Sequence, residues 1–446
     1  MTERSAHRNA SAWLLPGLML AGAVLGLVVG AVLGERWTEK ALEPLVLGIR
    51  LCGVIFLALL KGLIVPLVVT SVITGITRMG DLRKVGRLAG LTAGYFAFTS
   101  FLAVLTGMVV VNLVQPGKRG GAGAAPTEIP EAASAAAQST AQAVYDVIGG
   151  MFPSNLFAAA AEGNILGLIV FSLIFGVVLA LEGLRARPLV EVIDVANEAL
   201  LRLVRYVIWL APIGIFGLVA DRIGKAGGGD AIWSEVQRLG WYALAVMLAL
   251  SIHALVTLPL LLRFLGKRNP ARYAGGMADS LITAVGTASS AATMPITLRC
   301  VMHENGVSRR AADLVIPLGT TVNMDGTALY EAVAVIFIAQ TMGLDLSLSQ
   351  QLVILVTATL AAVGAAAIPE AGLVTMVIVL GAVGLPAEGI GLLLSIDWVL
   401  DRFRTGVNVW GDSVGAGIID RFVPPEPAAE PAALDVAGPA PSRSSI

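Results

Sequence analysis

Charged residues are scarce in this chain. Lys, Arg, Asp and Glu together account for 14% of its 446 residues, and 56% of the residues are hydrophobic. A soluble domain carries about 25% charged residues, so this composition excludes a soluble globular protein and indicates a polytopic integral membrane protein. The formal net charge of −1 points to no particular partner, and no nucleic-acid partner is expected.

Cysteine and histidine are rarer still. The two cysteines, Cys52 and Cys300, lie in or beside apolar stretches, so the sequence offers no disulfide framework. The three histidines, none of them at the spacing of a metal site, are His7, His253 and His303. A resident metal or organic cofactor is therefore not expected.

Six apolar segments in the first 265 residues are each long enough to cross a bilayer as a helix. They lie at residues 12–34, 46–75, 88–115, 155–181, 194–220 and 239–265. The first is longer than the apolar core of a typical signal peptide, so we interpret it as a transmembrane helix. Lys and Arg concentrate after the second, fourth and sixth segments, which places those loops in the cytoplasm. We expect a multi-pass protein of the plasma (inner) membrane with both termini in the cytoplasm.

Beyond residue 270 the apolar segments are interrupted by Gly, Pro, Ser, Thr and charge. Residues 285–297 read VGTASSAATMPIT and residues 360–373 read LAAVGAAAIPEAGL, so both combine small residues with a proline. Non-helical backbone at membrane depth survives only where protein or water satisfies it, so each segment predicts a helical hairpin that enters partway and returns. Two such hairpins suggest inverted repeats and a transporter binding site. Close helix packing through small residues is the alternative for either segment alone.

A row of polar residues runs through the last apolar segment, whose residues 397–412 read DWVLDRFRTGVNVWGD. At helical spacing, six of them share one face: Asp397, Asp401, Arg404, Thr405, Asn408 and Asp412. A charge at the centre of a bilayer costs about 3 kcal/mol, so an unpaired row would be strongly destabilising. We expect this face, called the polar stripe below, to line a path for ions and substrate.

A third polar cluster lies at residues 319–331, GTTVNMDGTALYE, again inside an apolar stretch. Gly326 and the β-branched residues around it weaken a helix, which would expose backbone carbonyl groups. With the Asn323 amide and the Asp325 carboxylate, these carbonyls are hard oxygen ligands that suit a small cation such as Na⁺. An isolated turn is the alternative, although it fits a loop better than the middle of a span.

These motifs resemble those of the dicarboxylate/amino acid:cation symporters, which include the excitatory amino acid (glutamate) transporters. The resemblance is carried by NMDGTALYEA at 323–332, DRFRTGVNVWGDSVGAGI at 401–418 and the two interrupted segments. It implies a glutamate-transporter-like elevator fold of eight transmembrane helices plus two re-entrant helical hairpins in inverted repeats, assembled as a homotrimer.

The same resemblance divides the chain. Residues 1–265 would form mainly the scaffold and trimerisation helices, of which the third and sixth move with the transport core. That core would comprise residues 266–422, with the two hairpins and the last two spans. The Pro- and Ala-rich residues 423–446 would form a disordered cytoplasmic tail.

The resemblance also assigns substrate-binding residues. Asp401 would bind the amino group of the substrate, and Arg404 its side-chain carboxylate. Asn408 and Ser290 would hold the α-carboxylate. The further positions are Ser289, Thr327, Ala367, Ile368 and Thr405. Relatives with neutral substrates lack an arginine at the position of Arg404, so an acidic substrate is favoured. Ala367 stands in place of a usual glycine, which would stiffen the second hairpin.

Three sodium sites are implied as well. The ligands of the first would be Gly319, Asn323, Asn408 and Asp412. The second would use backbone carbonyls of Thr321, Ala362, Val363 and Ala365. The third would use Thr99, Ser100, Asn323 and Asp325 with the carbonyl of Phe96.

Glu331 occupies a position where, by the same resemblance, relatives coupled to protons and potassium carry Glu and purely sodium-coupled relatives carry Gln. A carboxyl group at membrane depth can take up and release a proton, so Glu331 is a candidate for proton coupling. A permanently paired Glu is the alternative.

The sequence therefore predicts a secondary active symporter for L-aspartate or L-glutamate driven by Na⁺, with H⁺ coupling and K⁺ counter-transport left open. A C4-dicarboxylate symporter of the same fold, for succinate, fumarate or malate, is the runner-up. A gated channel and an intramembrane aspartyl protease built on Asp325 and Asp412 are competing classes, but the protease lacks a partner motif around a second Asp. An ATP-driven pump is disfavoured, because no G-x-x-x-x-G-K-[ST] stretch is present.

Overall fold

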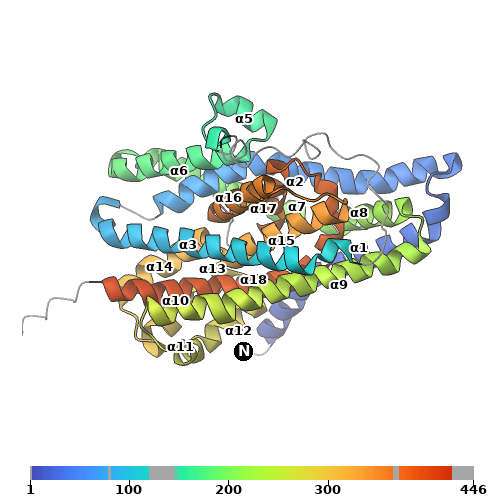
Figure 1. Ribbon diagram of the computed structural model, residues 1–446. Coiled ribbons are helices and arrows are strands. Elements are labelled where there is room, and N and C mark those ends of the chain that lie inside the picture. Colours follow the sequence, from blue (N-terminus) through green and yellow to red (C-terminus); the bar gives the residue numbers. More distant parts are fainter. Residues whose placement is uncertain (1–2, 79–81, 120–144, 146–147, 365–370, 424–446) are drawn as a thin grey trace, which may run out of the picture.

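The computed structural model describes residues 3–78, 82–119, 145, 148–364 and 371–423. In these residues the chain forms α-helices joined by 3-10 turns, π turns and loops, and it contains no β-strand. The long helices lie side by side along one direction (Figure 1). The predicted all-α class is therefore confirmed.

The first part of the chain consists mostly of long helices. In chain order they are α1 (Glu3–Leu33), α2 (Glu43–Thr77), α3 (Leu82–Val114), α5 (Leu156–Glu162), α6 (Ile165–Glu182), α7 (Arg187–Ile208), α8 (Ala211–Lys225), α9 (Gly229–Ile252) and α10 (Leu258–Phe264). Over the described residues, six helical stretches are long and apolar enough to cross a membrane, or seven if the bent pair α7–α8 is one span. The predicted polytopic membrane class is confirmed.

Two of the predicted apolar segments are divided. Segment 155–181 is split into α5 and α6 at Gly163, which has a φ of 76°, and Asn164, whose side chain caps α6. Segment 194–220 is bent by 53° between α7 and α8. Pro212 stands in the first turn of α8 and has no N–H donor, which favours a helix start there. Apolar side chains continue across Trp209 and Leu210, so hydropathy does not reveal the bend, whereas Glu162, Gly163 and Asn164 interrupt the apolar run at the α5–α6 break.

Helix α1 approaches α8 closely through glycines spaced four residues apart. A Cβ atom would lie 2.2 Å from the carbonyl oxygen of Pro212 if built on Gly22, and 2.8 Å from that of Phe216 if built on Gly26. On Gly30 it would lie 2.8 Å from the Ile223 Cβ atom. Small residues at this spacing let two membrane helices approach within backbone contact, which stabilises the pair without a hydrophobic driving force.

The second part of the chain consists of shorter helices and one long one. They are α11 (Pro270–Gly276), α12 (Ala278–Thr287), α13 (Ser290–Arg299), α14 (Arg309–Val322), α15 (Asp325–Thr341), α16 (Leu348–Gly364), α17 (Ala371–Ala382) and α18 (Ile390–Ile419). Helices α12 and α13 contact each other and meet at Ala288, with a φ of 49°, and Ser289. The turn falls within the predicted segment 285–297, and Pro295 lies inside α13. Helices α16 and α17 also contact each other.

Helix α15 forms the centre of the second part. Every residue from Asp325 to Gln340 is buried, and α3, α9, α16, α17 and α18 all contact the helix. Asn323 and Met324 have non-helical dihedral angles and separate α14 from α15, which confirms the predicted weak point in this segment. Just beyond the break, a Cβ atom on Gly326 would lie 2.7 Å from the backbone oxygen of Arg404. The broken helix therefore lies directly against the polar stripe of α18.

Candidate functional site

Polar groups at the α14–α15 break are hydrogen-bonded to side chains of the polar stripe. Asn323 Nδ2 donates to Asp412 Oδ1 at 3.0 Å, and the backbone N–H of Gly326 donates to Asn408 Oδ1 at 2.8 Å. Asn408 Nδ2 in turn donates to the Thr327 hydroxyl oxygen at 3.3 Å. The stripe thus satisfies a backbone donor in the first turn of α15, where no intrahelical acceptor is available.

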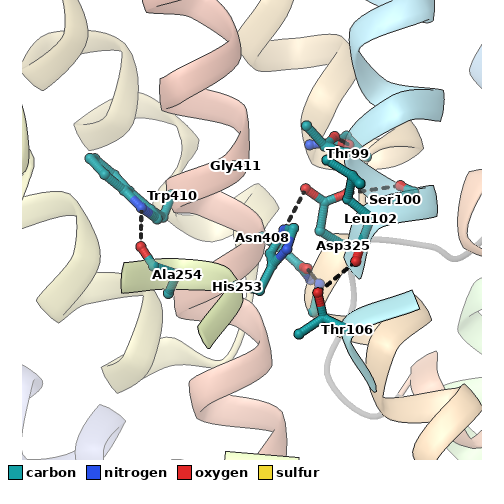
Figure 2. Close-up of polar contacts among 12 residues, drawn as sticks. Thr99, Ser100, Leu102, Thr106, His253, Ala254, Asp325, Asn408, Trp410 and Gly411 are labelled. Carbon is teal, nitrogen blue, oxygen red and sulfur yellow. Dashed lines mark hydrogen bonds and ion pairs between the residues drawn. The ribbon is translucent and has the colours of Figure 1, made fainter. Parts of the chain in front are cut away.

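Helix α3 supplies two hydroxyl groups to the same cluster. Ser100 Oγ donates to Asp325 Oδ1 at 2.8 Å, as Figure 2 shows. Thr99 Oγ1 lies 3.3 Å from Asn323 Oδ1, and it also lies 3.2 Å from the backbone oxygen of Phe96. All five residues are buried. The predicted members of the third sodium site are therefore brought together from α3 and from the break.

The Asp412 carboxylate lies against the backbone of α14. A Cβ atom on Gly319 would lie 2.3 Å from Asp412 Oδ1, so this approach requires glycine. The other oxygen, Oδ2, has no hydrogen-bond partner among the described residues, although Asp412 is almost fully buried. A buried carboxylate oxygen without a donor is costly, and a bound cation would offset that cost. Carboxylate, amide and carbonyl oxygens are the ligands that hard cations take in proteins.

Arg404 is fully buried between carboxylates and an aromatic ring. Its Nη2 atom lies 2.8 Å from Asp401 Oδ1 and 3.1 Å from Asp397 Oδ1, and its guanidinium carbon lies 3.9 Å from the ring centroid of Tyr330. A Cβ atom on Gly372 of α17 would lie 2.4 Å from Nη1. The Nε and Nη1 atoms have no acceptor within the described part of the chain. A buried guanidinium with open donors can take a further carboxylate.

Helix α12 is joined to α18 by a residue outside the predicted set. Arg402 Nη1 donates to the backbone oxygens of Val285 at 3.2 Å and Gly286 at 2.7 Å. Ser289 Oγ accepts from the N–H of Ala292 and caps α13. Ser290, the first residue of α13, is buried.

The other predicted site residues are distributed as follows. Thr405 is buried in α18, and Thr321 Oγ1 donates to the Leu318 oxygen within α14. Glu331 is fully buried in α15, and its two carboxyl oxygens have no hydrogen-bond partner among the described residues. Ala362 is buried in α16, which also contains Val363. The predicted residues outside the described part of the chain are Ala365, Ala367 and Ile368.

Besides Arg402, three residues of this site had no role assigned from the sequence. Tyr330 lies in the NMDGTALYEA motif, but its stacking on Arg404 depends on how α15 and α18 pack. His253, on the distant segment that ends α9, lies 3.4 Å from Asp325 through its Nε2 atom. Asp397 belongs to the predicted stripe and had no assigned role, and the structure pairs it with Arg404. Its spacing of seven residues from Arg404 was the available signal.

Comparison with known proteins matches this chain to one family and to named relatives. The family described as the sodium:dicarboxylate symporter family matches residues 15–422. Excitatory amino acid transporter 3 of Oryctolagus cuniculus is 37% identical over 459 residues, which cover 92% of this chain and 85% of the relative. Excitatory amino acid transporter 5 of Mus musculus is 37% identical over 465 residues, which cover 90% of this chain and 81% of the relative. An excitatory amino acid transporter of Caenorhabditis elegans is 37% identical over 456 residues, which cover 92% of this chain and 88% of the relative.

Proposed function

The chain belongs to the sodium:dicarboxylate symporter family, and we propose that it is a secondary active symporter that carries L-aspartate or L-glutamate together with Na⁺. It is a transport protein and not an enzyme. The names of the relatives that match over most of both chains support an acidic amino acid as the substrate.

The main structural support for an acidic substrate is the buried environment of the Arg404 guanidinium group. A buried guanidinium whose Nε and Nη1 donors have no acceptor among the described residues suits the side-chain carboxylate of the substrate, because its planar fork matches two carboxylate oxygens. Asp401, whose Oδ1 lies 2.8 Å from Arg404, would bind the substrate amino group. Asn408 and Ser290 would hold the α-carboxylate. The remaining proposed contacts are Ser289, Thr327, Ala367, Ile368 and Thr405.

Sodium would bind around the α14–α15 break. One site would use Asp412, with Gly319, Asn323 and Asn408, and its support is the buried Oδ2 atom that lacks a donor in the described residues. A further site would use Asp325 with Asn323, Thr99, Ser100 and the carbonyl of Phe96. Its support is the contact of Ser100 with Asp325 and the contacts of Thr99 with Asn323 and the Phe96 carbonyl. The carbonyl groups proposed for a third ion belong to Thr321, Ala362, Val363 and Ala365.

The architecture proposed for this function has eight transmembrane helices and two re-entrant hairpins, α12–α13 and α16–α17. Residues 1–265 would supply mainly the scaffold of a homotrimer, and residues 266–422 the core that moves like an elevator. The interlocking glycines of α1 and the contact of α1 with α8 support a rigid scaffold. Both termini would lie in the cytoplasm, and the protein would reside in the plasma (inner) membrane.

A C4-dicarboxylate is the second candidate substrate, and the family description itself includes dicarboxylates. Asp401 argues against it. A dicarboxylate has no amino group, so the buried Asp401 carboxylate would face a second negative charge in place of a cation. Proton coupling through the buried Glu331 remains part of the proposal.

Uptake by liposomes containing the purified protein tests the proposal. Labelled aspartate, glutamate and succinate are each offered with and without an inward Na⁺ gradient. We expect saturable uptake of the two amino acids only with the gradient, and little uptake of succinate. Aspartate uptake that is indifferent to Na⁺ would contradict the symport mechanism, and succinate uptake above that of aspartate would favour the dicarboxylate alternative.

A further inference from the structure

Helix α9 ends in a π turn, His253–Thr257, before the chain continues as α10. Single π turns inside α-helices are uncommon and are frequent at functional sites. The backbone oxygen of Ala254 in this turn accepts a hydrogen bond from Trp410 Nε1 of α18 at 3.0 Å (Figure 2). A side chain of α18 therefore fixes the turn, whose first residue is His253.

His253 directs its ring at the Asp325 carboxylate. The side chain is fully buried, and Nε2 lies 3.4 Å from Asp325 Oδ2 (Figure 2). An ionised carboxylate can only accept hydrogen bonds, so a neutral imidazole in this contact carries its proton on Nε2. Asp325 Oδ1 is already engaged by Ser100. The two carboxylate oxygens are thus held by two different elements, α3 and the π turn that follows α9.

Among the described residues, the contact with Asp325 is the one side-chain hydrogen bond of His253. Its Nδ1 atom has no partner among the residues that the structure describes, so Nε2 makes the polar contact of the buried ring. An imidazole placed only to fill the core would leave both ring nitrogens unsatisfied, and an apolar side chain would fill the same space at lower cost.

We propose that His253 is a positioning residue for Na⁺: by donating Nε2–H to Asp325 Oδ2, it fixes the orientation of a carboxylate that binds the ion. This inference rests on the proposed function, which makes Asp325 a sodium ligand. Hydrogen bonds from outside the ligand shell orient ligating carboxylates, and their loss lowers metal affinity about 10- to 100-fold. His253 itself touches neither the ion nor the substrate in this role.

Three substitutions of His253 and one control variant distinguish a role in positioning Asp325 from a role in packing alone. His253→Gln places an amide N–H near the position of Nε2 and keeps a donor toward Asp325. His253→Asn is too short to reach, and His253→Leu removes the donor while filling the space. The control is His303→Leu, which changes an exposed histidine in the other π turn, Cys300–Glu304.

The measurement is the Na⁺ concentration for half-maximal aspartate uptake in liposomes, together with the aspartate concentration for half-maximal uptake at saturating Na⁺. We expect His253→Leu and His253→Asn to raise the Na⁺ value about tenfold. Their aspartate value at saturating Na⁺ should stay close to that of the unaltered protein. His253→Gln should recover most of the Na⁺ affinity, and His303→Leu should change neither value.

The proposal is overturned if His253→Leu or His253→Asn keeps the original Na⁺ dependence. It is also overturned if His253→Gln loses as much Na⁺ affinity as His253→Asn, because the two side chains carry the same amide group and differ only in length. If His253→Leu fails to fold, the Gln and Asn variants alone decide the question. A lack of Na⁺ dependence in the unaltered protein would instead contradict the proposed function.

Discussion

The guanidinium group of Arg404 lies over the ring of Tyr330, with 3.9 Å between the guanidinium carbon and the ring centroid. Tyr330 belongs to α15 and Arg404 to α18, so this contact joins the broken helix to the polar stripe. The ring covers one face of the guanidinium plane, while Asp397 and Asp401 engage the Nη2 atom at its edge. Together these contacts fix the plane in which a substrate carboxylate would be bound.

Replacing Tyr330 by Leu should weaken aspartate binding. A desolvated cation–π contact is worth about 2 kcal/mol, which corresponds to about a thirtyfold rise in the half-saturating aspartate concentration. Tyr330→Phe keeps the ring and should stay near the original value. The comparison is made by aspartate uptake at saturating Na⁺, and equal values for the Leu and Phe variants would show that the ring does not support Arg404.

Replacing Asp397 by Asn should destabilise the protein without substrate. Removing one partner of a buried ion pair costs about 3–5 kcal/mol, since the remaining charge loses compensation. A bound acidic substrate would restore a carboxylate to Arg404, so aspartate should raise the thermal midpoint of this variant more than that of the unaltered protein. Asp279→Asn, which breaks an exposed pair with Arg299, is the control and should change little. If aspartate raised the thermal midpoint equally in Asp397→Asn and in the unaltered protein, Asp397 would not be the carboxylate that compensates Arg404 in the absence of substrate.

Replacing Gly319 by Ala should impair sodium binding. The new methyl group would lie 2.3 Å from Asp412 Oδ1, so the carboxylate has to move. Overpacking of this kind costs about 1–3 kcal/mol, and we expect about a tenfold rise in the half-saturating Na⁺ concentration. Gly90→Ala in α3 meets no atom within 4 Å and serves as the control. An unchanged Na⁺ dependence in Gly319→Ala would argue against an ion at Asp412.

Much of this arrangement follows from sequence patterns, because helical periodicity places residues on a common face. The stripe from Asp397 to Asp412 is on one buried helix, and the weak point at Asn323 is a break. Contacts between segments far apart in the chain could not be predicted in this way. The approach of His253 to Asp325 depends on a π turn and on the packing of α9 against α15, and neither leaves a periodic signal.

The bend between α7 and α8 shows a second limit. Apolar side chains continue across Trp209 and Leu210, so hydropathy predicts one segment where the backbone changes direction by 53°. The division between α5 and α6 differs, because Glu162, Gly163 and Asn164 interrupt the apolar run there, and a left-handed glycine followed by a capping asparagine ends one helix and starts the next. Apolar composition predicts that such segments lie in a membrane, whereas the positions of their breaks depend on local residues such as proline, glycine and capping side chains.

Replacing Glu331 by Gln should reduce the pH dependence of uptake. Glutamine has the same shape and cannot exchange a proton, so a carrier that loads a proton at this position loses the step. Aspartate uptake is measured over a series of external pH values at saturating Na⁺. Glu304→Gln, at an exposed position, is the control. Identical pH profiles for Glu331→Gln and the unaltered protein would exclude Glu331 from a proton route.

The substrate selectivity of the Arg404→Cys variant tests the central claim most directly. The variant removes charge-assisted hydrogen bonds worth about 1.5–3 kcal/mol each, so aspartate uptake should fall about a hundredfold. Na⁺-driven uptake of small neutral amino acids should appear, because Asp401 and Asn408 remain. Arg309→Cys, at an exposed helix start, should retain aspartate uptake. Undiminished aspartate uptake by Arg404→Cys would contradict the assignment of Arg404 as the group that binds the substrate's side-chain carboxylate.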